Sequence, residues 1–156
     1  MNLKELNILL ADDDTDDCIF FEKALKELPL STIFTAVHDG EQLMDYLSNA
    51  LLAQNLEPLP DVLFLDLNMP RKNGFECLSD IKQNMKLKDI PVVIFSTSYP
   101  QNPDYEHDMI NMLLKFGADD FIRKPDDFEQ LKKLIHLALT MVTEKISFNE
   151  KRENEL

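Results

Sequence analysis

The chain has 156 residues, of which 29% are charged and 44% hydrophobic, a composition typical of one globular domain. Acidic residues outnumber basic residues by 29 to 16, and the net charge of −13 disfavours direct binding to nucleic acid. No apolar run approaches the roughly 20 residues that span a membrane, so we expect no membrane partner. The only cysteines, Cys18 and Cys77, predict buried, inert thiols rather than disulfides or zinc ligands, and we expect a reducing, cytoplasmic location.

Five short apolar runs alternate with five longer amphipathic stretches. The short runs suit strands of a parallel sheet that is covered on both faces, and they span residues 7–11, 32–37, 62–65, 91–95 and 121–122. Helical spacing of apolar residues follows each run, at residues 16–28, 41–53, 74–85, 104–116 and in a last helix after Pro125. This alternation predicts a doubly wound α/β domain with five parallel strands.

The sequence also predicts where regular structure ends. We expect the domain to cover residues 1–147 and residues 148–156 to form a polar, frayed tail. Residues 99–106 contain two prolines among polar residues and predict a surface loop. Only three glycines are present, which excludes both a P-loop and a G-x-G-x-x-G dinucleotide turn.

Polar side chains follow four of the five predicted strands. They are Asp12, Asp13 and Asp14 after the first strand, Asp66 after the third, Ser96 after the fourth and Lys124 after the fifth. Sites in open α/β sheets form at the carboxyl ends of strands, so these groups share one crevice if their strands are neighbours. Clustered carboxylates need a cation among them, and hard oxygen ligands suit Mg²⁺. A lysine and a hydroxyl in the same crevice suit a phosphoryl group.

The acidic run has other interpretations. Asp14, Asp16 and Asp17 are better explained as the N-cap and first-turn residues of a helix. An EF-hand loop is excluded because its sixth position is not glycine and its twelfth is not glutamate. A phosphatase-like D-x-D-x-T site fits the spacing of Asp12 and Asp14, but Thr15 comes one residue early. The three histidines show no partner in the sequence, and we assign them no chemistry.

Four segments together resemble the receiver domain of two-component response regulators. They are ILLADDD at the first strand, PDVLFLDLNMPRKNGFE around the third, PVVIFSTS at the fourth and GADDFIRKP at the fifth. The match extends over residues 7–145 in the order and spacing of that family. The resemblance implies a flavodoxin-like (βα)5 fold with strand order 2-1-3-4-5, and a stand-alone, single-domain response regulator that acts in a phosphorelay.

The resemblance also implies a role for each polar residue. Asp66 would be the phosphoacceptor, receiving a phosphoryl group from a sensor histidine kinase or a phosphotransfer protein. Asp12, Asp13 and Asp66, together with the backbone carbonyl of Asn68, would hold Mg²⁺ or another divalent cation. Lys124 would neutralise the phosphoryl oxygens, and its peptide bond to the following proline is commonly cis in the family.

Ser96 and Phe121 would form the implied switch. Ser96 would move toward the phosphoryl group, and the Phe121 ring would fill the vacated space and reshape the face formed by the fourth helix, fifth strand and fifth helix. That face would bind a downstream protein or a second copy of the chain. Taken alone, Phe121 is better explained by core packing and Lys124 as a surface lysine, and only their places within the joint motif favour the functional roles. The alternative function is a Mg²⁺-dependent phosphohydrolase with an aspartate nucleophile, whereas a receiver is not an enzyme beyond its own phosphorylation and dephosphorylation.

Overall fold

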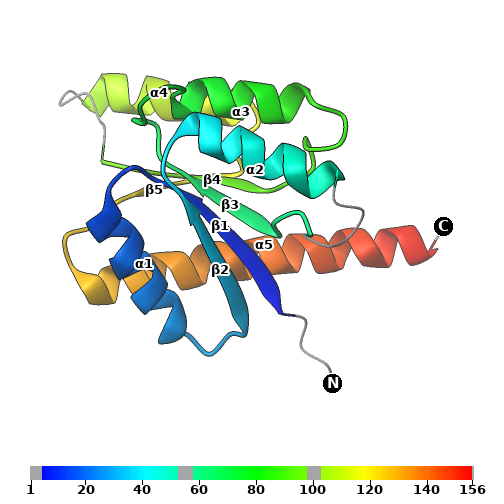
Figure 1. The fold of residues 1–156 in the computed structure, drawn as a ribbon. Helices are drawn as coiled ribbons and strands as arrows, with labels where there is room; N and C mark the ends of the chain where they lie inside the picture. The colour runs from blue at the N-terminus through cyan, green and yellow to red at the C-terminus, as the bar shows by residue number, and fades with distance from the viewer. Residues whose placement is uncertain (1–4, 53–57, 98–102, 156) are drawn as a thin grey trace.

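The fold is a five-stranded parallel sheet between two layers of helices (Figure 1). The computed structural model describes residues 5–52, 58–97 and 103–155. The strands, in spatial order 2-1-3-4-5, are β1 (Leu6–Ala11), β2 (Thr32–Val37), β3 (Val62–Leu65), β4 (Val92–Ser96) and β5 (Asp120–Arg123). The helices are α1 (Thr15–Lys26), α2 (Gly40–Leu52), α3 (Gly74–Gln83), α4 (Pro103–Lys115) and α5 (Phe128–Glu155). The predicted doubly wound, flavodoxin-like fold and its strand order are confirmed.

Each inner strand is buried on both faces, because successive side chains point to opposite sides of the sheet. Helices α2, α3 and α4 cover one face over an aliphatic core, and α1 and α5 cover the other. On the α1 and α5 side, the ring of Phe21 packs 4.8 Å from that of Phe64 and 5.4 Å from that of Phe95, centroid to centroid. Both layers fix the strands firmly, so the loops at the carboxyl ends of the strands start from rigid positions.

Short polar residues begin the helices that lead away from these strand ends. Asp14 accepts a hydrogen bond from the backbone N–H of Asp17 at 3.1 Å, and Asn73 caps α3 in the same way, accepting from Glu76 at 2.9 Å. Gly74 opens α3 where the chain passes close to β3, since a Cβ there would lie 2.2 Å from the backbone oxygen of Asp66. These caps and this close approach fix the chain on either side of the predicted site.

Two expected boundaries differ from the structure. Helix α5 runs on through Glu155 in place of a frayed tail from residue 148, because glutamate, lysine and arginine are good helix formers even without a core to pack on. The domain boundary proposed at residue 147 stays a prediction. Helix α4 begins at Pro103, within the predicted loop 99–106, because proline suits the first position of a helix. Residues 99–102 lie outside the described residues.

Two further observations complete the fold. None of the helices in the described ranges combines the length and the apolarity that a membrane crossing needs. The peptide bond between Lys124 and Pro125 is trans, as are the others in the described residues, which differs from the cis bond that the resemblance implies.

Candidate functional site

Three carboxylates meet where β1 and β3 end. Asp12 and Asp13 follow β1 directly, Asp66 follows β3, and these two strands are hydrogen-bonded neighbours. One oxygen atom from each of the three carboxylates lies within 4.8 Å of the other two. Asp12 is completely buried and Asp66 nearly so, whereas Asp13 is exposed. The arrangement is a small acidic crevice that opens to solvent on the side of Asp13.

Lys124 is the cation of this crevice. It follows β5, and its side chain is only 8% exposed. Its Nζ atom lies 2.6 Å from Oδ2 of Asp12 and 3.6 Å from Oδ2 of Asp66. The ring centroid of Phe95 lies 5.3 Å from the same ammonium, which adds a cation–π contact. The prediction that Lys124 and Asp66 share one crevice is therefore met in the structure, and an ordinary surface position for this lysine is excluded.

A hydroxyl and a backbone amide complete the surroundings of Asp66. The Oγ–H of Ser96, at the end of β4, donates to Oδ1 of Asp66 at 2.9 Å. The backbone N–H of Asn68 lies 3.4 Å from the same oxygen, at the long end of hydrogen-bond distances. These two donors lie at Oδ1, and the other oxygen of Asp66, Oδ2, is the one that lies near Lys124.

Phe121 lies on β5, the strand next to β4. It pairs in register with Ile94 of β4, and its half-buried ring packs against the aliphatic core under α2, α3 and α4. The structure therefore shows the core packing that the sequence left open as the simpler explanation. The predicted role of the Phe121 ring in a switch is untested by this arrangement.

Burial and charge oppose each other at Asp12 and Lys124. Burial raises the pKa of Asp12 to about 6, although hydrogen bonding and attraction to Lys124 act to lower it. Burial acts to lower the pKa of Lys124, but the ion pairs with Asp12 and Asp17 outweigh it and raise that pKa above its ordinary value. Lys124 is therefore charged at neutral pH, and Asp12 is ionised at a cost in free energy.

The donor set fits a hard divalent cation. Lys124 contacts Asp12, Asp17 and Asp66, and Asp13 lies beside Asp12 and Asp66. The one charge of this ammonium does not compensate four carboxylates. Oδ2 of Asp12 is fully buried and accepts no hydrogen bond of regular geometry, although Lys124 lies beside it. Closely grouped oxygen ligands and a solvent-facing side are what Mg²⁺ and Mn²⁺ bind.

Two neighbours of the crevice were not predicted from the sequence. Asp17, predicted only as a first-turn residue of a helix, accepts a hydrogen bond from Nζ of Lys124 at 2.8 Å. His38, to which no chemistry was assigned, lies beside the loop after β1, with Nδ1 3.2 Å from the backbone oxygen of Asp12. Neither contact has a local signal in the sequence, because the partners are 107 and 26 positions apart. The placement of Asp14 as an N-cap is confirmed.

Both cysteines are buried, as predicted. Burial raises the pKa of Cys18 to about 12 and that of Cys77 to about 11. The two thiols are therefore protonated at neutral pH, and a nucleophilic role for either is disfavoured.

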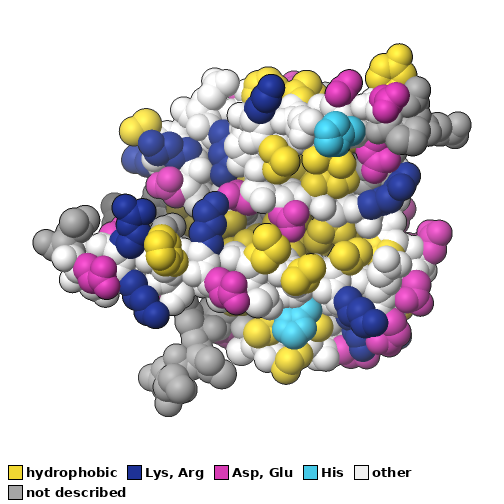
Figure 2. Space-filling view, turned by 180° about the vertical axis from the view of Figure 1, so that it is seen from behind, with side chains coloured by type: hydrophobic (Ala, Val, Ile, Leu, Met, Phe, Trp, Pro, Cys, Tyr) yellow, Lys and Arg dark blue, Asp and Glu magenta, His cyan; other side chains and the backbone are white. Residues whose placement is uncertain are grey.

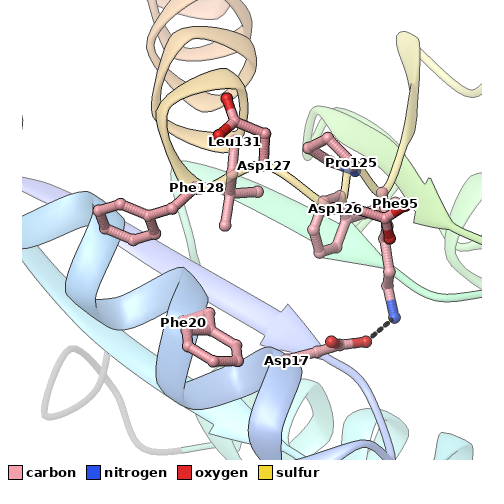
Figure 3. Close-up of a pocket in the computed structure, with 9 residues that line it drawn as sticks. Asp17, Phe20, Phe95, Pro125, Asp126, Asp127, Phe128 and Leu131 are labelled. Atoms are coloured by element: carbon pink, nitrogen blue, oxygen red, sulfur yellow. Dashed lines mark hydrogen bonds and ion pairs between the residues drawn. The ribbon is translucent and has the colours of Figure 1, made fainter.

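A pocket adjoins the crevice between the start of α1 and the loop from β5 to α5 (Figure 3). Its walls include the rings of Phe20 and Phe128, and Asp17 lies at the end of the pocket nearest to Lys124. Lys124 also lines this pocket, so the pocket and the acidic crevice share one side chain.

Comparison with known proteins identifies the family. The family model described as the response regulator receiver domain matches residues 8–136. Response regulator Rcp1 of Synechocystis is 37% identical over 95 residues, which cover 61% of this chain and 64% of Rcp1. The nitrate/nitrite response regulator NarL of Escherichia coli is 32% identical over 137 residues, 88% of this chain and 56% of NarL. The chain thus matches less than two thirds of the length of these two relatives.

Solved structures agree with these sequence matches. The Mn²⁺-bound form of Rcp1 superposes with a TM-score of 0.70 at 30% identity and covers 83% of this chain and 88% of that one. The phosphorylated cyanobacterial phytochrome response regulator RcpA gives a TM-score of 0.72 at 31% identity, with 85% and 89% covered. The comparisons give no support to the phosphohydrolase alternative.

Proposed function

The chain belongs to the family of response regulator receiver domains, and from this premise we propose that it accepts a phosphoryl group on Asp66. Receiver domains are signalling proteins of two-component systems, so a sensor histidine kinase or a phosphotransfer protein is the donor. The observation that carries the proposal is the set of groups around the Asp66 carboxylate. Ser96 lies 2.9 Å from one oxygen, Lys124 lies 3.6 Å from the other, and two further carboxylates lie within 4.8 Å.

The transfer is a displacement at phosphorus. Oδ2 of Asp66 attacks the phosphorus atom, the bond from phosphorus to the donor nitrogen breaks, and the donor imidazole keeps the electron pair. Oδ2 is the better placed oxygen because Ser96 donates to Oδ1. The developing negative charge lies on the phosphoryl oxygens, where the ammonium of Lys124 and the hydroxyl of Ser96 can stabilise it.

We assign Mg²⁺ to the acidic crevice. The side chains of Asp12, Asp13 and Asp66 would hold it, and the backbone carbonyl of Asn68 would supply a fourth oxygen ligand. When bound, a divalent cation neutralises the oxygens of the transferring phosphoryl group. Asp12 serves this role best when ionised, and its raised pKa makes cation binding weaken as the pH falls below about 6.

The signal leaves through the face of α4, β5 and α5 in this proposal. Ser96 moves toward the phosphoryl group, Phe121 changes its packing, and the face changes shape. Figure 2 shows hydrophobic side chains gathered on the side of the molecule that carries α5. Exposed hydrophobic residues of this face include Met112 on α4 and Leu137 and Met141 on α5. Such side chains suit a downstream protein or a second copy of the chain. A cytoplasmic location stays a prediction.

Incubation with acetyl phosphate and Mg²⁺ tests the proposal. The wild-type chain should gain one phosphoryl group, stable in acid and labile in base, and intact-mass spectrometry followed by peptide mapping should locate it on Asp66. Asp66→Asn should gain none. Asp45→Asn is the matched control, since Asp45 is exposed on α2 and outside the crevice. An adduct that persists in Asp66→Asn would contradict the assignment.

The same preparation tests the phosphohydrolase alternative. A receiver should release phosphate only from its own adduct, so p-nitrophenyl phosphate should be turned over no faster by the wild type than by Asp66→Asn. Rapid hydrolysis of this unrelated monoester, lost in Asp66→Asn, would contradict the signalling proposal.

A further inference from the structure

Asp17 is a third carboxylate on Lys124, outside the acidic group assigned to the cation. Its Oδ2 accepts a hydrogen bond from Nζ of Lys124 at 2.8 Å, and Figure 3 shows this contact at the edge of the pocket. Asp12, Asp13 and Asp66 form the candidate cation-binding group, and Asp17 is not part of it among the described residues. The contact of the Asp17 carboxylate is instead with the ammonium of Lys124.

The ammonium lies closer to Asp12 and Asp17 than to the phosphoacceptor. Nζ of Lys124 is 2.6 Å from Asp12 and 2.8 Å from Asp17, but 3.6 Å from Asp66. An ammonium has three protons to donate, and three carboxylates already surround it, so a phosphoryl group on Asp66 competes with Asp17 for one of these protons. This competition acts against phosphorylation.

We propose that Asp17 is a positioning residue that draws the ammonium of Lys124 toward itself and thereby limits phosphorylation of Asp66. The inference rests on the proposed function of Asp66. The side chain of Asp17 is 35% exposed, so its ion pair with Lys124 is partly screened and its effect is moderate. Asp17 thus adjusts the rate of phosphoryl uptake without being required for it.

The first test compares Asp17→Asn with Asp16→Asn. Both variants remove one carboxylate from the first turn of α1, and with it a similar interaction with the helix dipole. Asp16 is exposed and makes no ion pair with Lys124 among the described residues. At saturating Mg²⁺, Asp17→Asn should raise the initial rate of adduct formation from acetyl phosphate about three-fold. Asp16→Asn should stay within about 1.5-fold of wild type.

The second test asks whether Asp17 acts through Lys124. In a Lys124→Met background, replacement of Asp17 by asparagine should change the rate no more than replacement of Asp16 does, because the competing ammonium is gone. Should uptake be too slow to measure there, binding of beryllofluoride with Mg²⁺, followed by NMR, gives the same comparison. Calorimetric Mg²⁺ affinity should be similar in Asp17→Asn and Asp16→Asn, since neither residue is assigned to the cation.

The outcomes separate this inference from the proposed function. No adduct in the wild type would overturn the function itself. A wild-type adduct with an unchanged or lower rate in Asp17→Asn would overturn only the positioning role. An Asp17→Asn effect that survives at full size in the Lys124→Met background would also overturn it, because the residue would then act by charge alone.

Discussion

The two ends of the parallel sheet hold their charges in different surroundings. At the carboxyl end, Asp12 and Asp66 are buried beside Lys124, and carboxylates outnumber the ammonium. At the amino end, Asp119 precedes β5 and pairs with Lys145 of α5 at 3.1 Å, but the Lys145 side chain is 66% exposed. Water and salt screen the second pair and barely reach the first.

Burial therefore decides whether a charged group of this molecule affects its stability and its capacity to bind a cation. An exposed pair contributes little to stability because water competes for both partners. Buried carboxylates without enough cations raise the free energy of the fold and leave a site that gains from binding a cation or from pairing with donors. Without a cation the carboxyl end is therefore destabilised by its buried charges, whereas the exposed pair of Asp119 with Lys145 has little effect on stability.

The largest expected effect comes from Gly74→Ala at the carboxyl end. A Cβ there would lie 2.2 Å from the backbone oxygen of Asp66 and 2.8 Å from Cα of Leu67, and backbone atoms cannot yield as a side-chain tip can. We expect a loss of about 3 kcal/mol in the free energy of unfolding, measured by urea denaturation. A loss smaller than that of Gly117→Ala would show that the carboxyl end is not the more rigid of the two.

Asp12→Asn should show that the buried charge is costly. The pKa of Asp12 is raised from 3.8 to about 6, so ionisation of Asp12 lowers the stability of the folded protein. This loss is absent near pH 4 and is complete once the pH has risen through 6. Without metal near pH 8, the variant should be more stable than wild type by about 2 kcal/mol, and the gap should close toward pH 4.

Addition of Mg²⁺ should make the wild type more stable than Asp12→Asn, because the cation stabilises only the wild type. Urea denaturation at several pH values, with and without Mg²⁺, measures both effects. A gap that does not change with pH would contradict the raised pKa of Asp12.

Gly117→Ala probes the amino end in the same way. Gly117 has φ of 103°, and its Cβ would meet Cγ of Lys82 at 2.9 Å, a flexible side chain that can move aside. We expect the free energy of unfolding to fall by about 1–2 kcal/mol, because alanine disfavours this backbone conformation. Thermal unfolding in a Lys82→Ala background checks the cause, because relief of the loss there would point to the side-chain contact.

Lys145→Ala should have the smallest effect. The variant removes an exposed ion pair with Asp119, and we expect a loss below about 0.5 kcal/mol that shrinks further at high salt. Paired urea denaturation curves of variant and wild type at low and high salt measure it. A loss comparable to that of Gly117→Ala would break the contrast between the two ends of the sheet.

Much of the site followed from polar residues placed directly after apolar runs. Asp12 and Asp66 directly follow strands that the apolar pattern predicted, and Ser96 is the last residue of another. Parallel strands bring their carboxyl ends to one edge of the sheet. The ion pair between Asp17 and Lys124 could not be found in this way, because it depends on how α1 is rotated against β5. The polar run from residue 148 predicted a frayed tail, but its residues have high helix propensity and extend α5 to Glu155.

The sequence by itself determined the alternation of strands and helices, the two-sided burial of the sheet and the edge at which polar residues gather. These features depend on local periodicity, which a chain carries at every position. Only the tertiary structure decided which carboxylates approach Lys124, that Phe121 packs against the core and that His38 lies beside Asp12. Those contacts depend on how each helix is rotated and on where each loop runs. Shifts of a few ångströms would break them, and buried electrostatic interactions change steeply over such distances.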